Sequence, residues 1–261
     1  MKSRIVKRDF PFLSEEKNRP LHIYLPEGYD ESDERYPVMY FFDGHNLFSN
    51  DDATYGKSWG MRTFLDKWNK KMIVVGIECG HEGEERLSEY LPYPAGMGQF
   101  TKYAARGEQT MEWIINEVKP YIDCTYRTCP FRECTGIGGS SMGGVMSIYA
   151  AVHYNRWFSK AACISSAIWF CMPPLEQDLA MSEVDSNTRM FLSWGTLEAW
   201  GIRNVWAEDD HSETYRDNTK VANAIREKGA KAVAYSHVGG GHCEADWEKL
   251  VPKFMNFLWT E

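Results

Sequence analysis

The segment Gly139-Ser140-Ser141-Met142-Gly143 contains a serine with glycines two positions before and two positions after it. Where Gly-x-Ser-x-Gly follows a strand and opens a helix, the serine occupies a sharp turn, and the glycines avoid Cβ atoms that would collide there. The serine hydroxyl then lies at a helix start, where free N–H groups favour developing negative charge. The pattern therefore predicts that Ser141 is a nucleophile.

A nucleophilic serine needs a base within hydrogen-bond reach and an acid that orients this base. When the serine lies in such a turn, the chain order is nucleophile, acid, base. His242 follows three consecutive glycines after a predicted strand, and this loop can bring its imidazole back over the sheet edge. His237 is the competing histidine, but it lies inside the predicted strand. We therefore favour His242 as the base.

The acid is expected just after the predicted strand that ends at Trp194. Glu198 lies immediately beyond this strand, and its carboxylate would fix the imidazole tautomer and stabilise the imidazolium. Asp209 and Asp210 lie further along the chain and remain the alternatives.

The oxyanion that forms when a nucleophile attacks a carbonyl group needs two backbone N–H donors. Met142 directly follows the predicted nucleophile and supplies one of them. The second is expected in Asp43-Gly44-His45-Asn46, where Gly44 permits a close approach and the N–H of His45 is the predicted donor. His45 as the general base is the less favoured alternative, because it precedes the nucleophile in the chain.

Two clusters of ligand-type residues raise the alternative of metal chemistry. The run His81-Glu82-Gly83-Glu84-Glu85 resembles the start of a zinc-binding His-Glu-x-x-His motif, but Glu85 replaces the second histidine. The run Asp209-Asp210-His211 lacks partners at a clear ligand spacing. We expect both to be solvated loops, and we expect no metal site and no cofactor.

Strand-like and helix-like segments alternate in the second half of the chain, which predicts a mostly parallel sheet with helices on both faces. An antiparallel strand pair is expected at the N-terminus. The predicted strands are Arg4–Phe10, Leu21–Leu25, Val38–Phe42, Met72–Ile77, Cys134–Gly138, Ala161–Ser165, Met190–Trp194 and Ala232–Val238. The predicted helices are Glu108–Lys119, with Pro120 just past its end, Met142–Tyr154, Tyr215–Lys228 and Ala245–Leu258.

Three stretches are predicted to be irregular loops near the carboxyl ends of strands, where open α/β sheets bind ligands. They are Ser49–Gly60, Glu78–Gly98 and Trp169–Asp185.

The composition limits the classes of partner. The 261 residues fit one α/β domain spanning residues 1–261, and the net charge of −8 argues against nucleic acid and anionic membranes as partners. The odd number of cysteines, seven, indicates reduced thiols, and no apolar segment follows the basic N-terminus, so a cytoplasmic protein is expected. The composition does not decide between a monomer and a homo-oligomer.

A resemblance to a known family rests on motifs spread along nearly the whole chain. As a set, they resemble the esterases of the esterase D and enterochelin esterase-like group. The motifs are Asn18 to Pro26 with Gly28 to Asp30, Tyr36 to Phe48, Arg86 to Pro92, Pro120 to Thr128, Ile137 to Gly144, Ser165 to Phe170, Gly195 to Glu198 and His242 to Trp247.

This resemblance implies an α/β-hydrolase fold and a serine carboxylic-ester hydrolase that works through an acyl-enzyme. By position, it implies Ser141 as nucleophile, Glu198 as acid and His242 as base, with the N–H groups of His45 and Met142 as oxyanion donors. The group includes carboxylesterases, siderophore esterases, feruloyl and acetyl esterases, and related acyltransferases.

Aromatic residues in the predicted loops suit stacking on a sugar ring or on a phenolic acyl group. Acetyl or feruloyl esters of carbohydrates are therefore the expected substrates, either as small molecules or as oligosaccharides. An acyltransferase of the same fold and a siderophore-type ester hydrolase are the alternatives. The residues expected to contact substrate are Asp43, Asn46, Trp59, Tyr90, Trp169 and Trp200.

Overall fold

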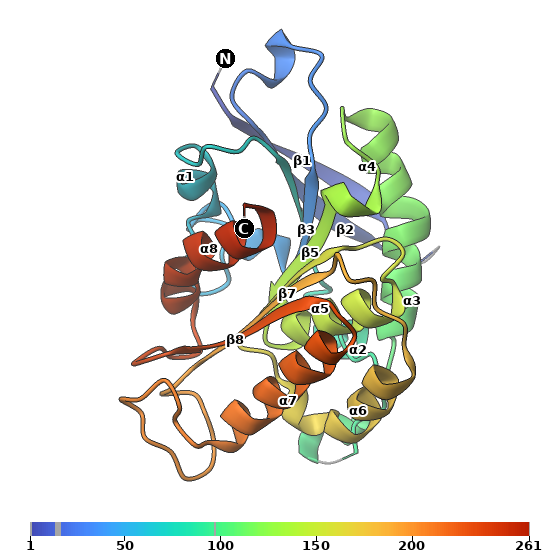
Figure 1. Ribbon diagram of the computed structural model, residues 1–261. Coiled ribbons are helices and arrows are strands. Elements are labelled where there is room, and N and C mark those ends of the chain that lie inside the picture. The colour runs from blue at the N-terminus through green and yellow to red at the C-terminus, as the bar shows by residue number, and fades with distance from the viewer. Residues whose placement is uncertain (1, 14–16, 97, 261) are drawn as a thin grey trace.

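The computed structural model describes residues 2–13, 17–96 and 98–260. Eight strands form one sheet in the order β1-β2-β4-β3-β5-β6-β7-β8 (Figure 1). β2 pairs antiparallel with β1 and β4, and every other neighbouring pair is parallel. The strands are β1 (Arg4–Pro11), β2 (Asn18–Leu25), β3 (Val38–Phe42), β4 (Ile73–Ile77), β5 (Thr135–Ser140), β6 (Lys160–Ile164), β7 (Arg189–Gly195) and β8 (Lys231–His237).

The predicted N-terminal antiparallel pair is confirmed. Arg4 of β1 lies opposite Leu25 of β2, and Pro11 lies opposite Asn18 at the other end. All residues of β3 and β4 are buried, as expected of parallel strands covered on both faces. The mostly parallel sheet predicted from the alternating segments is confirmed as well.

Helices cover both faces of the sheet, as predicted. Met39 and Phe41 of β3 belong to one hydrophobic cluster with side chains of α1 and α8. Val38 and Tyr40 belong to a second cluster with side chains of α3, α5, α6 and α7. Figure 1 shows these two groups of helices on opposite sides of the sheet. The helices are α1 (Met61–Leu65), α2 (Glu85–Glu89), α3 (Gly107–Trp113), α4 (Lys119–Thr125), α5 (Met142–His153), α6 (Met172–Met181), α7 (Glu213–Glu227) and α8 (Glu244–Trp259).

The helix predicted over Glu108–Lys119 continues beyond Pro120. α3 passes into a π-helical segment, Ile114–Val118, and then into α4. A proline inside a regular helix clashes with the carbonyl four residues earlier, but the wider π-helical turn directly before Pro120 changes that spacing. The prediction that the helix ends before Pro120 is therefore wrong.

The prediction of an irregular loop over Trp169–Asp185 is also wrong, because α6 occupies most of this stretch. Pro173 and Pro174 lie in the first turn of this helix. Proline suits this place because the first N–H groups of a helix have no intrahelical acceptor, and its fixed φ matches the helix. The two prolines therefore mark a helix start.

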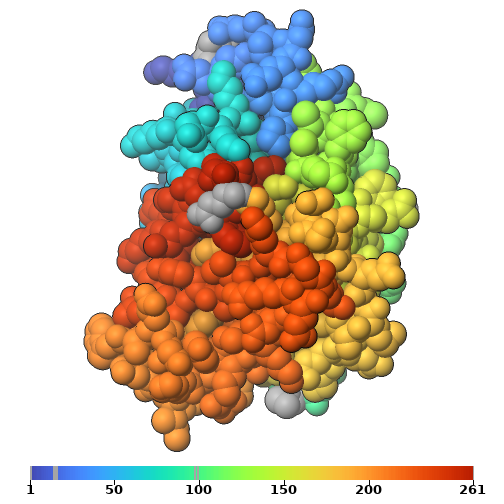
Figure 2. All heavy atoms as spheres, in the orientation of Figure 1, coloured from blue at the N-terminus to red at the C-terminus, as the bar shows by residue number. Residues whose placement is uncertain are grey.

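The carboxyl ends of the parallel strands meet at one edge of the sheet, so the loops that follow them lie close together. The long loop 196–212, between β7 and α7, projects from the body at the lower left of Figures 1 and 2. Every helix among the described residues is too short or too polar to span a lipid bilayer.

Gly44 and Gly76 lie where the backbone after β3 passes close to β4. A Cβ added at Gly44 would lie 2.3 Å from the carbonyl carbon of Gly76.

Gly44→Ala is expected to lower the free energy of unfolding by about 1–3 kcal/mol, because the backbone must shift. Urea unfolding measures this change. Gly96→Ala is the matched control, since its added Cβ meets nothing within 4 Å; equal midpoints for the two variants would contradict the argument.

Candidate active site

Ser141 lies in the turn between β5 and α5. Its backbone angles, φ 56° and ψ −118°, are rare for a residue with a side chain. Its N–H donates to the carbonyl of Ile164 (2.9 Å), and its own carbonyl accepts from the N–H of Ala167 (3.2 Å). Such a conformation persists only where the surrounding structure holds it. The sharp turn expected around Ser141 is therefore present.

The glycines around this turn are required by the close approach of backbone segments. A Cβ at Gly139 would lie 2.8 Å from the carbonyl carbon of Gly143. A Cβ at Gly143 would lie 2.9 Å from the Cβ of Phe42, and one at Gly144 would lie 2.4 Å from a side-chain oxygen. Side chains at these positions would displace the turn that presents the Ser141 hydroxyl.

His242 and Glu198 are in direct contact. Nδ1 of His242 hydrogen-bonds Oε2 of Glu198, although 44 residues separate them in the chain. The other carboxylate oxygen, Oε1, accepts from the hydroxyl of Ser165 (2.6 Å) and from the N–H of Gly195 (2.6 Å). The carboxylate is thus held in one orientation, and it can fix the imidazole so that Nε2 is free to act as a base.

Two residues to which the sequence analysis gave no role extend this network. The indole N–H of Trp247 donates to the hydroxyl oxygen of Ser165 (2.8 Å), which in turn donates to Glu198. The Trp247 ring also packs edge-on against the His242 ring, with 5.1 Å between their centroids. Ser165 has a positive φ of 46°. Both residues fall within motifs of the family resemblance, but no motif indicated their contacts.

The other candidates for acid and base lie in different surroundings. His237 is part of β8 and half-buried, and burial lowers its pKa. Asp210 is fully buried and accepts from the indole N–H of Trp194 (3.0 Å) and the hydroxyl of Ser212 (2.6 Å). Asp209 pairs with its neighbour His211. The structure thus brings Glu198, and not either aspartate, to His242.

Ser141, His242 and His45 line one cavity of about 410 Å³. Among the described residues, the His242 ring is hydrogen-bonded to Glu198 and not to the Ser141 hydroxyl. Catalytic hydrogen bonds are often long before substrate binds, so this arrangement is compatible with His242 as the base. Met142 is the first residue of α5, and His45 is the second of a short 3-10 helix, Gly44–Asn46. Neither N–H has an acceptor within its own helix, so both can donate to a ligand.

Asp43 and Asn46 lie in the wall of this cavity but bind internal partners. The buried carboxylate of Asp43 accepts two 2.7 Å hydrogen bonds from Arg86. Burial opposes its ionisation, but the charge and hydrogen bonds of Arg86 hold the pKa of Asp43 below its usual value. The side-chain oxygen of Asn46 accepts from the N–H of Thr54 (2.9 Å). Both side chains therefore help to hold the cavity wall, and their contact with substrate stays a prediction.

Of the four aromatic residues expected at the substrate, only two are accessible. Trp169 and Trp200 line a second cavity, of about 560 Å³, to which Glu198 and His242 also contribute. Trp59 is 3% exposed and packs against Phe41, Trp247 and Phe254 of the core. Tyr90 is 1% exposed, and its hydroxyl accepts from the N–H of Asp43. The expectation that Trp59 and Tyr90 bind substrate is corrected: both are packing residues.

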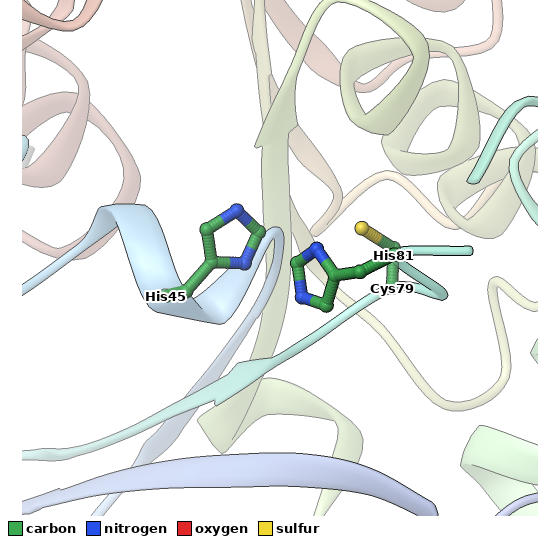
Figure 3. Close-up of side chains that lie close together, drawn as sticks. All are labelled: His45, Cys79 and His81. Atoms are coloured by element: carbon green, nitrogen blue, oxygen red, sulfur yellow. The ribbon is translucent and has the colours of Figure 1, made fainter. Parts of the chain in front are cut away.

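Residues 81–84 are exposed, as expected of a solvated loop, but the side chains of His81 and Glu85 bind other parts of the protein. Glu85 forms salt bridges with Lys17 and Arg19. His81 hydrogen-bonds Glu78 (2.7 Å), and its ring packs edge-on against that of His45. Burial would raise the pKa of Glu78, but hydrogen bonds from two histidines lower it to about 2. Metal-ligand atoms of His81, His45 and Cys79 lie within 4.8 Å of one another (Figure 3).

Removing the guanidinium from Asp43 would leave a buried carboxylate without its partner. Arg86→Met is expected to lower the free energy of unfolding at pH 7 by about 2–3 kcal/mol, less than for a fully buried pair because Arg86 is partly exposed. Since the pKa of Asp43 is lowered in the folded state, its stabilisation is present above the unfolded pKa and lost as the pH falls. The difference from wild type should therefore shrink in acid.

Denaturant unfolding from pH 7 down to pH 3 measures this dependence. The double variant Asp43→Asn/Arg86→Met is the control, and it should regain part of the lost stability because no charge stays buried alone. A penalty for Arg86→Met that is constant with pH would count against the ion pair as its cause.

The sequence matches the family described as "Putative esterase" over residues 14–258. A curated relative, an uncharacterized protein of Bacillus subtilis named YbbA, is 27% identical over 222 residues, which cover 83% of this chain and 82% of the relative. A solved IroE-like serine hydrolase from Shewanella oneidensis has a TM-score of 0.72 at 20% identity, covering 98% of this chain and 79% of that one.

A solved ferulic acid esterase has a TM-score of 0.69 at 16% identity, covering 98% of this chain and 97% of that one. At such identities these structures support the fold, which agrees with the α/β-hydrolase arrangement expected from the sequence. The family match spans nearly the whole chain. This protein therefore belongs to that esterase family and is an esterase of the α/β-hydrolase fold.

Proposed function

We propose that the protein is a serine carboxylic-ester hydrolase in which Ser141 is the nucleophile, His242 the base and Glu198 the acid. The observation that carries this proposal is the contact between Glu198 and His242 beside the cavity that Ser141 lines. These three residue types perform the same roles in serine hydrolases of unrelated fold.

In the first half-reaction, Nε2 of His242 accepts the proton of the Ser141 hydroxyl while the hydroxyl oxygen attacks the ester carbonyl carbon. The carbonyl oxygen becomes an oxyanion that accepts hydrogen bonds from the N–H groups of His45 and Met142. The imidazolium then gives its proton to the alcohol oxygen as the carbon–oxygen bond breaks. The alcohol leaves, and the acyl group stays on Ser141 as an ester.

In the second half-reaction, water replaces the alcohol. His242 accepts a proton from water as the water oxygen adds to the acyl carbon, and the oxyanion again lies between the two N–H donors. The bond to the Ser141 oxygen breaks, and His242 returns the proton to this oxygen. The products are a carboxylic acid and the free enzyme.

The second cavity supports an aromatic acyl group as the preferred substrate. Trp169, Trp194 and Trp200 supply its apolar surface, and it reaches the catalytic pair at His242 and Glu198. Its lining contains no lysine or arginine among the described residues. A neutral phenolic acyl group such as feruloyl fits these walls better than the anionic catechols of a siderophore. The fold shared with a ferulic acid esterase is consistent with this choice.

The alcohol part of the substrate is proposed to be a carbohydrate, as a small molecule or an oligosaccharide. The cavity at Ser141 is lined mainly by polar residues, among them His45, Asn46 and Thr54, which suit sugar hydroxyls. Acetyl esters of carbohydrates are the smaller substrates of the same class. An acyltransferase would use the same residues with an alcohol in place of water, so adding acceptor alcohols and measuring the product ratio distinguishes the two.

The cytoplasm is the proposed location. All seven cysteines are free thiols, and three of them, Cys79, Cys163 and Cys171, are buried. Free thiols are typical of proteins in a reducing compartment. Neither nucleic acid nor a membrane is proposed as a partner, because the chain carries a net charge of −8.

Replacing the nucleophile tests the mechanism. Ser141→Ala is expected to lower kcat for p-nitrophenyl acetate by roughly four to six orders of magnitude with nearly unchanged stability, because the acyl-enzyme cannot form. Labelling with a fluorophosphonate probe should be lost as well. The matched control is Ser140→Ala at the neighbouring position, which should keep both labelling and activity above the Ser141→Ala level. Hydrolysis by Ser141→Ala at the wild-type rate would refute the proposal.

Replacing the acid tests the role of Glu198 separately. Glu198→Gln keeps the size of the side chain but cannot stabilise the imidazolium, so kcat should fall by about 10³–10⁴-fold. Asp210→Asn, the competing carboxylate, is the comparison in steady-state kinetics. A larger loss in kcat at residue 210 than at residue 198, with both variants folded by circular dichroism, would reassign the acid.

Trp200 tests the assignment of the aromatic cavity. Trp200→Ala should lower kcat/KM for a feruloyl ester by about 5–10-fold, the loss expected for one aromatic contact, and change kcat/KM for the acetyl ester little. Trp206→Ala is the matched control: it lies in the same loop, is 76% exposed and does not line the cavity. Equal effects on both esters would argue against an acyl-binding role for Trp200.

A further inference from the structure

We propose that His45, Cys79 and His81 form a zinc-binding site with two imidazole nitrogens and one thiolate as ligands. Parallel pairing of β3 and β4 brings these residues together, because Phe42 lies opposite Ile77 at the strand ends and the ligands follow within four residues. Figure 3 shows the two rings and the sulfur directed toward one another. The candidate ligand atoms all lie within 4.8 Å of one another.

Small movements bring these atoms to the geometry that zinc requires. With Zn–N and Zn–S bonds of about 2.0 and 2.3 Å, the corners of a tetrahedron are about 3.3–3.6 Å apart. His45 and Cys79 are buried, whereas His81 is exposed on a turn that contains Gly80 and Gly83. Rotation of the His81 side chain is therefore the movement that closes the site.

His45 carries a ring nitrogen that lacks a partner. Its Nε2 lies 2.9 Å from the hydroxyl oxygen of Thr54, while its buried Nδ1 has no hydrogen-bond partner. The residue is only 6% exposed, and a buried polar atom without a partner is costly. If Nε2–H donates to Thr54, Nδ1 presents its lone pair to the cluster. A metal ion at this position would satisfy Nδ1.

His81 is oriented in the same way by a carboxylate. Its Nε2 lies 2.7 Å from Oε2 of Glu78, so donation from Nε2–H leaves the lone pair on Nδ1. A carboxylate behind a ligating histidine is a recurring feature of zinc sites, where it fixes the tautomer and makes the imidazole a better ligand. The other oxygen of Glu78 is held by His22 (2.5 Å). Both histidines thus offer the nitrogen that zinc needs.

The charge and chemistry of the cluster suit zinc better than magnesium or calcium. Nitrogen and sulfur donors select zinc over cations that prefer oxygen. The Cys79 thiol would lose its proton to solvent on binding, and the thiolate and Glu78 would offset the charge of the ion. Three protein ligands leave a fourth position open. This position faces the cavity that Ser141 lines, because all three ligands belong to its wall.

Metal binding to the untagged full-length chain tests this site. Competition with a chromophoric chelator gives the Zn²⁺ affinity, and Co²⁺ substitution reports a thiolate ligand through its charge-transfer absorption. We expect one Zn²⁺ per chain. His81→Gln and Cys79→Ala should abolish this binding, and Cys79→Ala should remove the charge-transfer band. Glu78→Gln should weaken it by about 10–100-fold, as outer-shell changes do.

Matched controls separate this site from general metal binding. His211→Gln removes another exposed histidine with a carboxylate partner, and Cys171→Ala removes another buried thiol. Both should bind Zn²⁺ as wild type does. Ser141→Ala should also bind as wild type, so the result does not depend on the proposed hydrolase mechanism. Wild-type affinity in His81→Gln, or no Zn²⁺ bound by the wild-type chain, would overturn the proposal.

Discussion

Parallel pairing of β3 to β8 is the constraint on which the site depends. It places the ends of β3, β4, β5, β7 and β8 at one edge of the sheet, and each end supplies a part of the site. His45 follows β3, Ser141 follows β5, Glu198 follows β7 and His242 follows β8. These residues are far apart in the chain. Backbone hydrogen bonds between the strands, and not contacts among the side chains, bring them together.

A second constraint is the fixed orientation of the Glu198 carboxylate. One oxygen contacts His242, and the other accepts from a backbone N–H and from Ser165, which itself accepts from Trp247. Ser165 holds a positive φ, so strain occurs on both sides of the site, here and at Ser141. Such strain persists because the buried sheet around it leaves no alternative conformation. The packing around the sheet therefore holds both the Glu198–His242 pair and the turn at Ser141.

The sequence predicted the sheet well because buried parallel strands appear in it as short apolar runs. It predicted the turn at Ser141 because the glycines on either side are required by close backbone approaches. It placed Ser141, Glu198 and His242 in loops at one edge of the sheet, since chain order and strand ends determine these positions. It failed at Trp59 and Tyr90, because an aromatic residue in a loop can face either the core or a cavity. It also failed at Pro120, which follows a π-helical segment, and at Pro173, which lies in the first turn of a helix.

The cluster around His81 was missed for a different reason. The His-Glu-x-x-His motif considered for His81 has both histidines on one helix. His45 and His81 come instead from loops after two different strands, and strand pairing makes them neighbours. The role proposed for the His45 backbone does not restrict its side chain, because an N–H donor to an oxyanion is available from nearly any residue. The side chain of residue 45 can therefore have a separate role. The unpartnered Nδ1 of His45 supports metal binding as that role.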